Sequence, residues 1–489
     1  MGSGSLRIVL ASFALAVAAV GLPGGCASAP KAVAPAPPVR AVETFDEVWQ
    51  AIADAETDAP RADVDWNALR EEYRPKAAAA RDVDELRAIL EEMVGRLGQS
   101  HFGIMPRELA GAGDGPEPED APAHDHAPDD GGPTGDLGVQ FRRVERTIAT
   151  VAPTRDGPAE RAGIRAGWEL LAVDGRRVEV PTADLGPVER TLMMTPPKPG
   201  DAMRRFRAES TAAMAAATAA GSSVDLTLRD DAGAERHLRI TAGDLGGEIV
   251  EFGNLPPLEA RVDARLVGDA EWTAFGAAGQ PRRIGLIAFN VWMLPTAAAI
   301  DAAVDRFRDC DAIILDLRGN PGGVGGLAMG VGGHFLGQAD SLGRMTNRGG
   351  AIDFRVNPRR STADGRRVEP FAGPLAILVD PLTASTSEIF AAGLQELGRA
   401  TIVGETTAGA ALPSVVRRLP NGDVLQMAVA DFVTPKGNRI EGHGVVPDVP
   451  VHLTLDLLRR ESDPTLAAAV RFLAERLADR SAAPAASSH

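Results

Sequence analysis

The sequence is poor in aromatic residues, in lysine and in positive charge as a whole. Phe, Trp and Tyr make up 4% of the 489 residues, so Ala, Val, Leu and Ile must form most of the core. Lys and Arg together number 51 against 67 Asp and Glu, which leaves a formal charge of −16. Nucleic acids are bound by clustered positive charge, so this balance argues against a DNA- or RNA-binding protein.

Cysteine is also scarce, with only Cys26 and Cys310 in the chain. Because Cys26 lies in a predicted export segment, Cys310 would have no partner for an internal disulfide in the mature protein. A disulfide framework and a four-cysteine zinc site are therefore excluded. His124 and His126 stand among aspartates, but nothing in that loop would preorganise metal ligands. We expect no metal and no other cofactor.

Long hydrophobic runs are missing as well. The apolar run from Ile8 to Val20 is shorter than the ~20 residues that cross a bilayer, and it resembles the hydrophobic region of a secretory signal. Two glycines then precede Cys26, as in a bacterial lipobox, whose cysteine is acylated. We expect a lipoprotein-type signal in residues 1–26 and an Ala- and Pro-rich linker in 27–41. A simple cleaved signal with an incidental cysteine is the alternative.

The length fits two or three domains, and composition divides the mature chain further. Residues 42–110 are expected to be helical, because Asp82 and Glu85 form a capping-box pattern before apolar residues at helical spacing. We expect an acidic disordered loop at 111–135, a strand-rich domain at 136–245, an α/β core at 246–475 and a disordered tail at 476–489. In the core, the strand-like runs Ile284–Phe289, Ala312–Leu317 and Leu375–Val379 alternate with helix-like stretches, which indicates parallel pairing.

Two motifs follow predicted strands of this core. The glycine-rich segment Asp316–Gly323 lacks the Gly-Lys-Ser/Thr ending of a phosphate-binding P-loop. It is either a plain tight turn or a turn whose backbone N–H groups point at an oxyanion. In Thr383–Glu388, Ser385 and Glu388 fit a capping box that would only begin a helix. The same spacing fits a nucleophilic serine at a helix N-terminus, where the helix dipole stabilises negative charge.

The segments Gly157–Gly167 and Leu170–Gly175 resemble a PDZ domain, which implies a β-sandwich or barrel over 136–245. By this resemblance, the carboxylate-binding loop is Leu137-Gly138-Val139-Gln140. It would hold the C-terminal carboxylate of a peptide that is added as a strand. The segment 185–222 is longer than PDZ domains usually allow, and its Ala-rich part, Thr211–Ala220, predicts an inserted helix.

The complete series of motifs resembles the carboxyl-terminal processing (tail-specific) serine peptidase family. The series is Asp316–Gly323, Ser385–Glu388, Gly398–Ala400, Val403–Glu405 and Gly444–Asp448, behind a PDZ domain. The resemblance implies an α+β multidomain protein with a crotonase-like α/β peptidase core. It also implies Ser385 as the nucleophile, and an oxyanion hole built from Gly322, Gly323 and Thr386.

One residue departs from that family. Its best-known members use a lysine base in a Thr-Phe-Gly-Lys-Gly motif, and the matching position here is Ala410. The four lysines are Lys31, Lys76, Lys198 and Lys436, and none is a convincing base.

Ser100 and His101 resemble the Ser-His pair of the related tricorn protease core, and Glu441 matches its glutamate. The implied catalytic set is therefore Ser385, His101, Ser100 and Glu441. His443 is a rival base, whereas His334 is expected to be structural.

We therefore expect an extracytoplasmic serine endopeptidase, periplasmic in a bacterium and held to its membrane by a lipid on Cys26. Its partners would be proteins or peptides selected by their C-terminal tails. The alternative is an inactive pseudopeptidase that binds such tails or other ligands without cleaving them.

Overall fold

The computed structural model describes residues 11–13, 40–55, 64–107, 135–151, 153–154, 156–178, 201–244, 246–250 and 258–482. The predicted lipidation site Cys26 and the histidines of the acidic loop lie outside these ranges, as do nearly all of the linker and of that loop. Within the described ranges, every helix is too short or too polar to cross a membrane.

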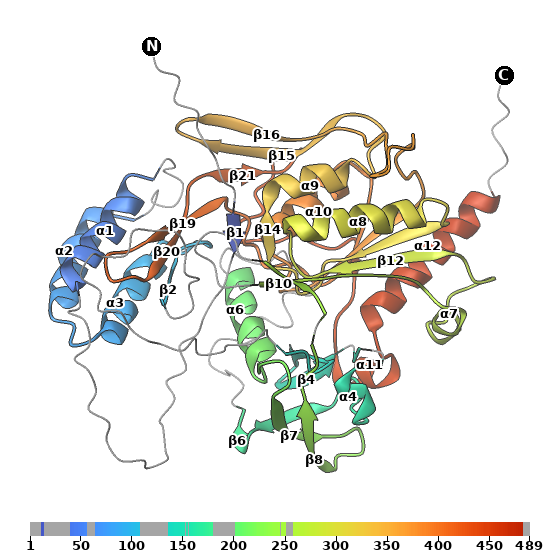
Figure 1. The fold of residues 1–489 in the computed structure, drawn as a ribbon, viewed down its shortest axis with the longest axis horizontal. Coiled ribbons are helices and arrows are strands. Elements are labelled where there is room, and N and C mark those ends of the chain that lie inside the picture. The colour runs from blue at the N-terminus through green and yellow to red at the C-terminus, as the bar shows by residue number, and fades with distance from the viewer. Residues whose placement is uncertain are drawn as a thin grey trace.

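Three helices form the N-terminal lobe seen in blue in Figure 1: α1 (Ala41–Ala53), α2 (Trp66–Ala78) and α3 (Val83–Gly95). As the capping pattern predicts, the Asp82 carboxylate accepts the N–H of Glu85 at 2.8 Å at the start of α3. The chain then enters β2 (Gly103–Met105), which pairs with β20 (Val424–Ala428) far along the sequence. The pairing fixes the segment after α3, including Ser100 and His101, against the C-terminal half of the protein.

A second domain, here called the middle domain (residues 135–244), contains an antiparallel sheet. Its strands are β3 (Gln140–Val144), β4 (Thr147–Val151), β5 (Glu169–Val173), β6 (Arg176–Arg177), β7 (Ser223–Arg229) and β8 (Glu235–Thr241). Two helices accompany the sheet, α4 (Pro158–Arg161) and α6 (Asp201–Met214). The predicted Ala-rich helix thus begins at Asp201 and not at Thr211. Alanine content alone misplaced it, because the burial of Phe206 and the ion pairs of the first ten residues fix the helix earlier.

The largest domain is built on a six-stranded sheet in the order β11-β12-β13-β17-β18-β22. The five strands from β12 onward are parallel, and the edge strand β11 is antiparallel to β12. This confirms the alternation read from the sequence. The strands are β11 (Val262–Leu266), β12 (Ile284–Phe289), β13 (Ala312–Asp316), β17 (Leu375–Val379), β18 (Thr401–Gly404) and β22 (Val449–Pro450).

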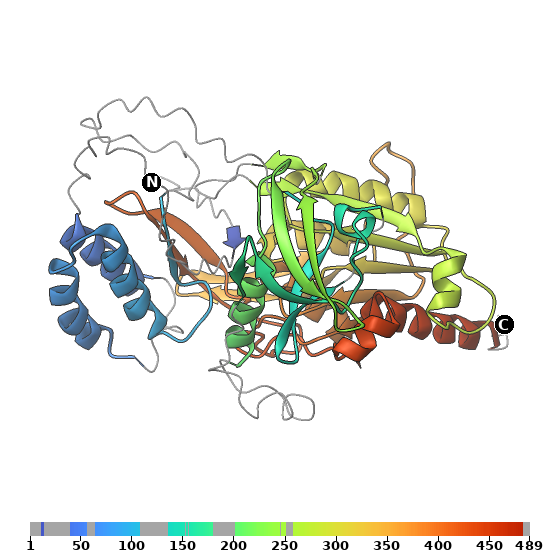
Figure 2. The same ribbon diagram turned by 90° about the horizontal axis from the view of Figure 1, so that it is seen from below.

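Helices cover both faces of this sheet (Figures 1 and 2). Helices α8 (Leu294–Phe307), α9 (Gly325–Gly332) and α10 (Thr386–Glu396) pack on one face, and α7 (Asp269–Ala274) and α12 (Pro464–Ala482) on the other. Side chains alternate along a strand, so Ile313 lies in the first core and its neighbour Ile314 in the second. Helix α11 (Leu455–Arg460) precedes α12, which continues to Ala482. The predicted disordered tail is therefore wrong for residues 476–482, and its remainder lies outside the described residues. Leu473 and Leu477 hold α12 there, because both are buried in the second core.

Short strands complete the structure. Strands β15 (Asp340–Asn347), β16 (Gly350–Val356) and β21 (Asp431–Val433) form one sheet, and β19 (Ser414–Arg418) joins β20 and β2 in another. Strand β9 (Glu248–Val250) pairs with β10 (Leu258–Ala260). Strand β14 (Gly322–Val324) pairs antiparallel with β1 (Ala11–Phe13), so an extended segment lies along the glycine turn.

Candidate active site

The predicted motifs meet at one edge of the six-stranded sheet. The glycine-rich segment follows β13, the segment with Ser385 follows β17, and the segment 405–411 follows β18. Strand β17 lies between β13 and β18, and all three are parallel. Their carboxyl ends therefore lie side by side, where open α/β sheets bind their ligands.

Ser385 precedes α10 in a strained backbone conformation. Its φ is 56° and its ψ is −119°, which a residue with a β-carbon rarely adopts. The side chain is fully buried, and its hydroxyl has no hydrogen-bond partner. Only half of the alternative capping box forms, because Glu388 accepts the Ser385 N–H at 3.1 Å while the Ser385 hydroxyl caps nothing. A cap therefore does not explain the hydroxyl.

Glu388 fixes the loop that carries this serine. Besides the N–H of Ser385, its carboxylate accepts the Thr407 hydroxyl at 2.5 Å and the N–H groups of Gly409 and Ala410 at 2.8 Å each. Burial raises the pKa of Glu388 to about 7, whereas these hydrogen bonds favour the ionised form. The sequence pattern around Glu388 indicates only a helix cap, because no local pattern reveals its connection to the 407–411 segment.

The glycine turn needs both of its glycines. A β-carbon on Gly322 would lie 2.7 Å from that of Ser385, and one on Gly323 would lie 2.3 Å from the Trp292 carbonyl oxygen. Both residues have positive φ, 103° and 140°. The N–H of Gly322 donates to Asn320 Oδ1 at 2.9 Å, and the Thr386 hydroxyl donates to the Gly323 carbonyl at 2.8 Å. The turn is thus locked beside Ser385, with the N–H of Gly322 already engaged.

Ser100, His101 and Glu441 come together in the structure although 340 residues separate His101 from Glu441 in the chain. The Ser100 hydroxyl lies 2.8 Å from Glu441 Oε2 and 2.7 Å from His101 Nδ1. A carboxylate only accepts, so the single hydroxyl proton of Ser100 goes to Glu441. His101 Nδ1–H must then donate to Ser100, which leaves the lone pair on Nε2. This is the tautomer that a general base requires.

The environment keeps His101 neutral. Burial lowers the pKa of His101 to about 4, and its Nε2 has no hydrogen-bond partner. Burial raises the pKa of Glu441, while the N–H groups of Ser100, at 2.7 Å, and Ala411, at 3.1 Å, stabilise its charge. Like Ser385, His101 has positive φ, 58°, so each of these two residues combines a strained backbone with a buried polar atom that has no hydrogen-bond partner.

The segment 407–411 connects the two halves of the site. The Ser385 N–H donates to the Ala410 carbonyl at 2.8 Å, and the N–H of Ala411 donates to the Glu441 carboxylate. At the position of the family's lysine, the Ala410 side chain is fully buried against Ala384, Ala408 and Phe206 of α6. The side chains that pack against Ala410 here are apolar.

The rival residues have other surroundings. His443 is exposed, and its Nδ1 donates to the Glu441 carbonyl at 2.9 Å. The buried His334 bonds Asp301 at 2.7 Å and Arg308 at 3.0 Å, which supports a structural role. The backbone N–H of Lys436 donates to Glu396 at 2.8 Å.

The predicted carboxylate-binding loop lies at the start of β3. Gly138 has φ 71°, and its N–H donates to Asp136 Oδ1 at 2.7 Å. The carbonyl groups of Leu137 and Gly138 accept the N–H groups of Ala159 and Thr154. Val139 and Gln140 complete the loop and lead into the strand.

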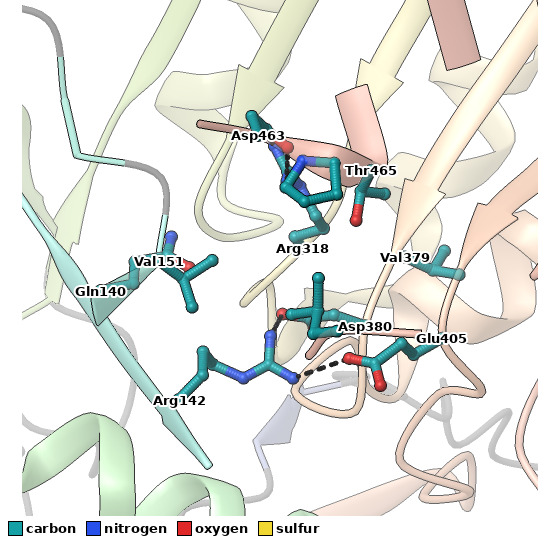
Figure 3. A pocket seen from close by; sticks show the side chains of 11 residues that line it. Gln140, Arg142, Val151, Arg318, Val379, Asp380, Glu405, Asp463 and Thr465 are labelled. Atoms are coloured by element: carbon teal, nitrogen blue, oxygen red, sulfur yellow. Dashed lines mark hydrogen bonds and ion pairs between the residues drawn. The ribbon is translucent and has the colours of Figure 1, made fainter. Parts of the chain in front are cut away.

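A buried ion cluster that no sequence motif indicated joins the middle domain to the loops beside Ser385. Arg142 of β3 contacts Asp380 at 2.5 Å, Glu209 at 2.9 Å and Glu405 at 3.3 Å. Burial lowers the pKa of Arg142, but the three carboxylates raise it by more, so the guanidinium stays charged. Figure 3 shows Arg142 beside a pocket between the two domains, with Arg318 and Asp463 on its far side. Nothing local in the sequence marks Arg142, because its partners lie far away in the chain.

Comparison with known proteins places two parts of the chain in known families. Residues 283–451 match peptidase family S41, and residues 41–95 match the tricorn protease C1 domain. The chain is 26% identical over 304 residues to a carboxyl-terminal-processing protease of Picosynechococcus, covering 62% of this chain and 60% of that one. It is 24% identical over 319 residues to the chloroplastic carboxyl-terminal-processing peptidase 3 of Arabidopsis thaliana, covering 64% and 52%. It thus spans roughly three fifths or less of the length of these two relatives.

Two solved structures share the fold. The photosystem II D1 C-terminal processing protease aligns with a TM-score of 0.50 at 22% identity, over 89% of this chain and 98% of that one. Mature CPAF aligns with a TM-score of 0.56 at 15% identity, over 91% and 98%. The S41 match begins just before β12 and ends after β22, so it contains Ser385 and Glu441. Residues 283–451 therefore resemble peptidase family S41, and the preceding residues 41–95 resemble the tricorn protease C1 domain.

Proposed function

We propose that this protein is a histidine-dependent serine endopeptidase of the carboxyl-terminal processing type. The observation that carries the proposal is the chain of hydrogen bonds from Glu441 through Ser100 to His101. It leaves a neutral imidazole with a lone pair on Nε2, in a protein that also buries an unused serine hydroxyl.

The proposed reaction is acyl transfer through Ser385. Its Oγ attacks the carbonyl carbon of the scissile peptide while His101 Nε2 takes the hydroxyl proton. The N–H groups of Gly323 and Thr386 would stabilise the oxyanion; Gly322 is left out because its N–H already donates to Asn320. His101 then gives its proton to the leaving amine, and water hydrolyses the acyl-enzyme by the same steps.

The substrate would lie as an extended strand along β14. Ala11–Phe13 already pairs there antiparallel with Gly322–Val324, which supports this edge as one that accepts a peptide. The middle domain would act as a PDZ module, in which the loop Leu137–Gln140 and the edge of β3 bind the C-terminal tail of a protein substrate. The crotonase-like description of the core, and an extracytoplasmic, lipid-anchored location through Cys26, complete the proposal.

Fluorophosphonate labelling tests the activated serine. We expect the purified wild type to be labelled at Ser385, and expect labelling to disappear in Ser385→Ala and to fall by ~10⁴-fold or more in His101→Ala. Ser387→Ala is a matched control, because Ser387 lies two residues away and accepts a hydrogen bond from Trp292 at 2.8 Å. A folded wild type that resists labelling would indicate the tail-binding pseudopeptidase instead.

A further inference from the structure

The edge of β3 that faces away from β4 is covered by the side chain of Glu209, from α6 of the same domain. Among the described residues, β3 pairs only with β4, and α6 lies along its other side. Arg143 N–H donates to Glu209 Oε2 of α6 at 3.0 Å, so this N–H points away from β4. In an antiparallel pair, the N–H and C=O of one residue point to the same side. Arg143 therefore carries the outward backbone groups that an added peptide strand would use.

Glu209 also belongs to the ion cluster that reaches the catalytic loops. The same oxygen that accepts the Arg143 N–H accepts Arg142 Nε at 2.9 Å. On the other side of the guanidinium, Asp380 accepts the N–H groups of Gly319 and Leu382 at 3.0 Å each. Gly319 precedes the glycine turn and Leu382 precedes Ser385. The cluster thus joins the peptide-accepting strand to both loops of the proposed site.

Helix α6 touches those loops a second time. Phe206 is buried against Ala384, Ala408 and Ala410, which surround the backbone of Ser385. Arg205 contacts Glu405 at 2.5 Å on the same side of the helix. A movement of α6 that releases Glu209 would therefore alter the packing beside the nucleophile.

We infer that Glu209 competes with the substrate tail for the edge of β3 and connects occupancy of that edge to the catalytic loops. The occupant is an extended peptide, and the inference deepens the proposed tail binding. To pair with β3, the peptide must take the Arg143 N–H from Glu209. Once the Glu209 carboxylate is displaced, Arg142 pairs only with Asp380 and Glu405. Helix α6 has then lost its bonds to β3 through Glu209, so it can shift together with Phe206. Glu209 is thus a positioning residue and touches no reacting atom.

The first test is peptide binding in the uncleaving Ser385→Ala chain. The probe is a fluorescein-labelled decapeptide of alternating Ala and Val with a free C-terminus, followed by fluorescence anisotropy. Glu209→Gln keeps the size of the side chain but removes its charge, and a charge-assisted hydrogen bond is roughly twice as strong as a neutral one. We expect Glu209→Gln to bind the peptide roughly three- to tenfold more tightly than the Ser385→Ala parent.

Two further variants make the test decisive. Glu209→Asp keeps the charge of the cluster but is one methylene shorter, so it should also bind more tightly and guards against a folding defect in Glu209→Gln. Glu235→Gln removes an exposed carboxylate on β8 of the same domain and should bind like the parent. Unchanged affinity in both Glu209 variants, or no binding of the peptide by any variant, would overturn the inference.

The effect of peptide binding at β3 on the loops around Ser385 is measured as the rate of fluorophosphonate labelling, in proteins that keep this serine. The peptide should change the labelling rate of the wild type. Glu209→Gln should change the labelling rate in the same direction without peptide. Phe206→Ala should bind the peptide, but its labelling rate should not change on binding. If peptide binding follows Glu209 but no chain is ever labelled, the peptidase proposal fails while the role of Glu209 at β3 survives. If labelling occurs and Glu209 has no effect on either readout, only the inference fails.

Discussion

Two residues of the candidate site, Ser385 and His101, have features that reduce stability but that the proposed reaction requires. Ser385 and His101 are both buried, both have positive φ, and both keep one polar atom without a partner. Each of these features costs stability, on the order of 1–3 kcal/mol for a strained conformation. These features persist because the carboxylates of Glu388 and Glu441 together accept seven hydrogen bonds from the surrounding loops and from Ser100. Burying these two atoms without partners reduces stability, and it fits the proposed roles of Ser385 as nucleophile and His101 as base.

The low pKa of His101 predicts an unusual acid limit. His101 must be neutral to take the proton from Ser385, so labelling should fall as the pH drops through about 4, well below the usual 6.5 of histidine. Rates measured between pH 3.5 and 8, with circular dichroism as a check on folding, would show this. A midpoint near 6.5 in folded protein would mean that His101 is solvated or is not the base.

The same shift links His101 to stability with a defined sign. Between pH 6.5 and 4 the unfolded chain binds a proton that the folded chain does not, so stability falls as the pH decreases through this window. The contribution is about 3 kcal/mol. Comparing wild type with His101→Gln by denaturant unfolding at pH 7.5 and 4.5 isolates it. Equal pH dependence of the two proteins would contradict the burial of a neutral imidazole.

Ala410 gives a further prediction at this scale. Lysine at this position should not restore activity to His101→Ala, because its amine would enter an apolar space filled by Phe206, Ala384 and Ala408. An unpaired buried charge costs several kcal/mol, so Ala410→Lys should also lower the thermal midpoint markedly. Ala410→Ser, nearly the same size and uncharged, is the control. Lysine-dependent labelling in the double variant would show that the space can be reshaped.

At the scale of elements, the sequence determined the core well and the site in part. Apolar runs located β12, β13 and β17, because a strand buried on both faces is hydrophobic throughout. The motifs after β13 and β17 also indicated the loops around Ser385. The half-formed capping box, the locked amide of Gly322 and the bonds of Glu388 depend on segments that meet only in the folded chain. Spacing along the sequence contains no information on such contacts.

Glu388 makes the segment 407–411 part of the nucleophile's support. In Glu388→Gln, an NH₂ group replaces one carboxylate oxygen, and with it two of the four hydrogen bonds that the carboxylate accepts. This NH₂ group is a donor, and it would face groups that also donate. We expect a loss of about 2–4 kcal/mol in stability and at least tenfold slower labelling of Ser385. Chemical denaturation and labelling kinetics measure the two effects.

The control for this variant is Glu396→Gln at the other end of α10, where the carboxylate bonds the N–H of Lys436 and the side chain of Asn438. It should change both quantities little, because Glu396 is only half-buried and its carboxylate bonds the turn at Lys436 and Asn438. If Glu388→Gln behaved like Glu396→Gln, the nucleophile would not depend on the carboxylate.

For the whole molecule, three parts of the chain contribute to the proposed site. The N-terminal lobe supplies Ser100 and His101, and the region that matches family S41 supplies Ser385 and Glu441. The family resemblance predicted these two contributions. The middle domain contacts the loops beside Ser385 through the ion pairs of Arg142 with Asp380 and Glu405 and through the packing of Phe206, which no motif records.

The last prediction concerns this interface. Arg142→Met keeps most of the volume but leaves the carboxylates of Glu209, Asp380 and Glu405 buried together without their main cation. Removing one partner of a buried ion pair typically costs 3–5 kcal/mol, so the variant should be destabilised by about that amount at pH 8. Thermal unfolding at this pH measures the loss.

Arg344→Met is the comparison, because Arg344 pairs with Asp353 while 56% of its side chain is exposed. Exposed pairs contribute about 0–1 kcal/mol, so the loss of this pair should cost far less than the loss of Arg142. An equally small effect for Arg142→Met would mean that water reaches the cluster and that the two domains are not held by it. A large loss for Arg142→Met alone would show that this ion cluster stabilises the contact between the proposed tail-binding domain and the loops around Ser385.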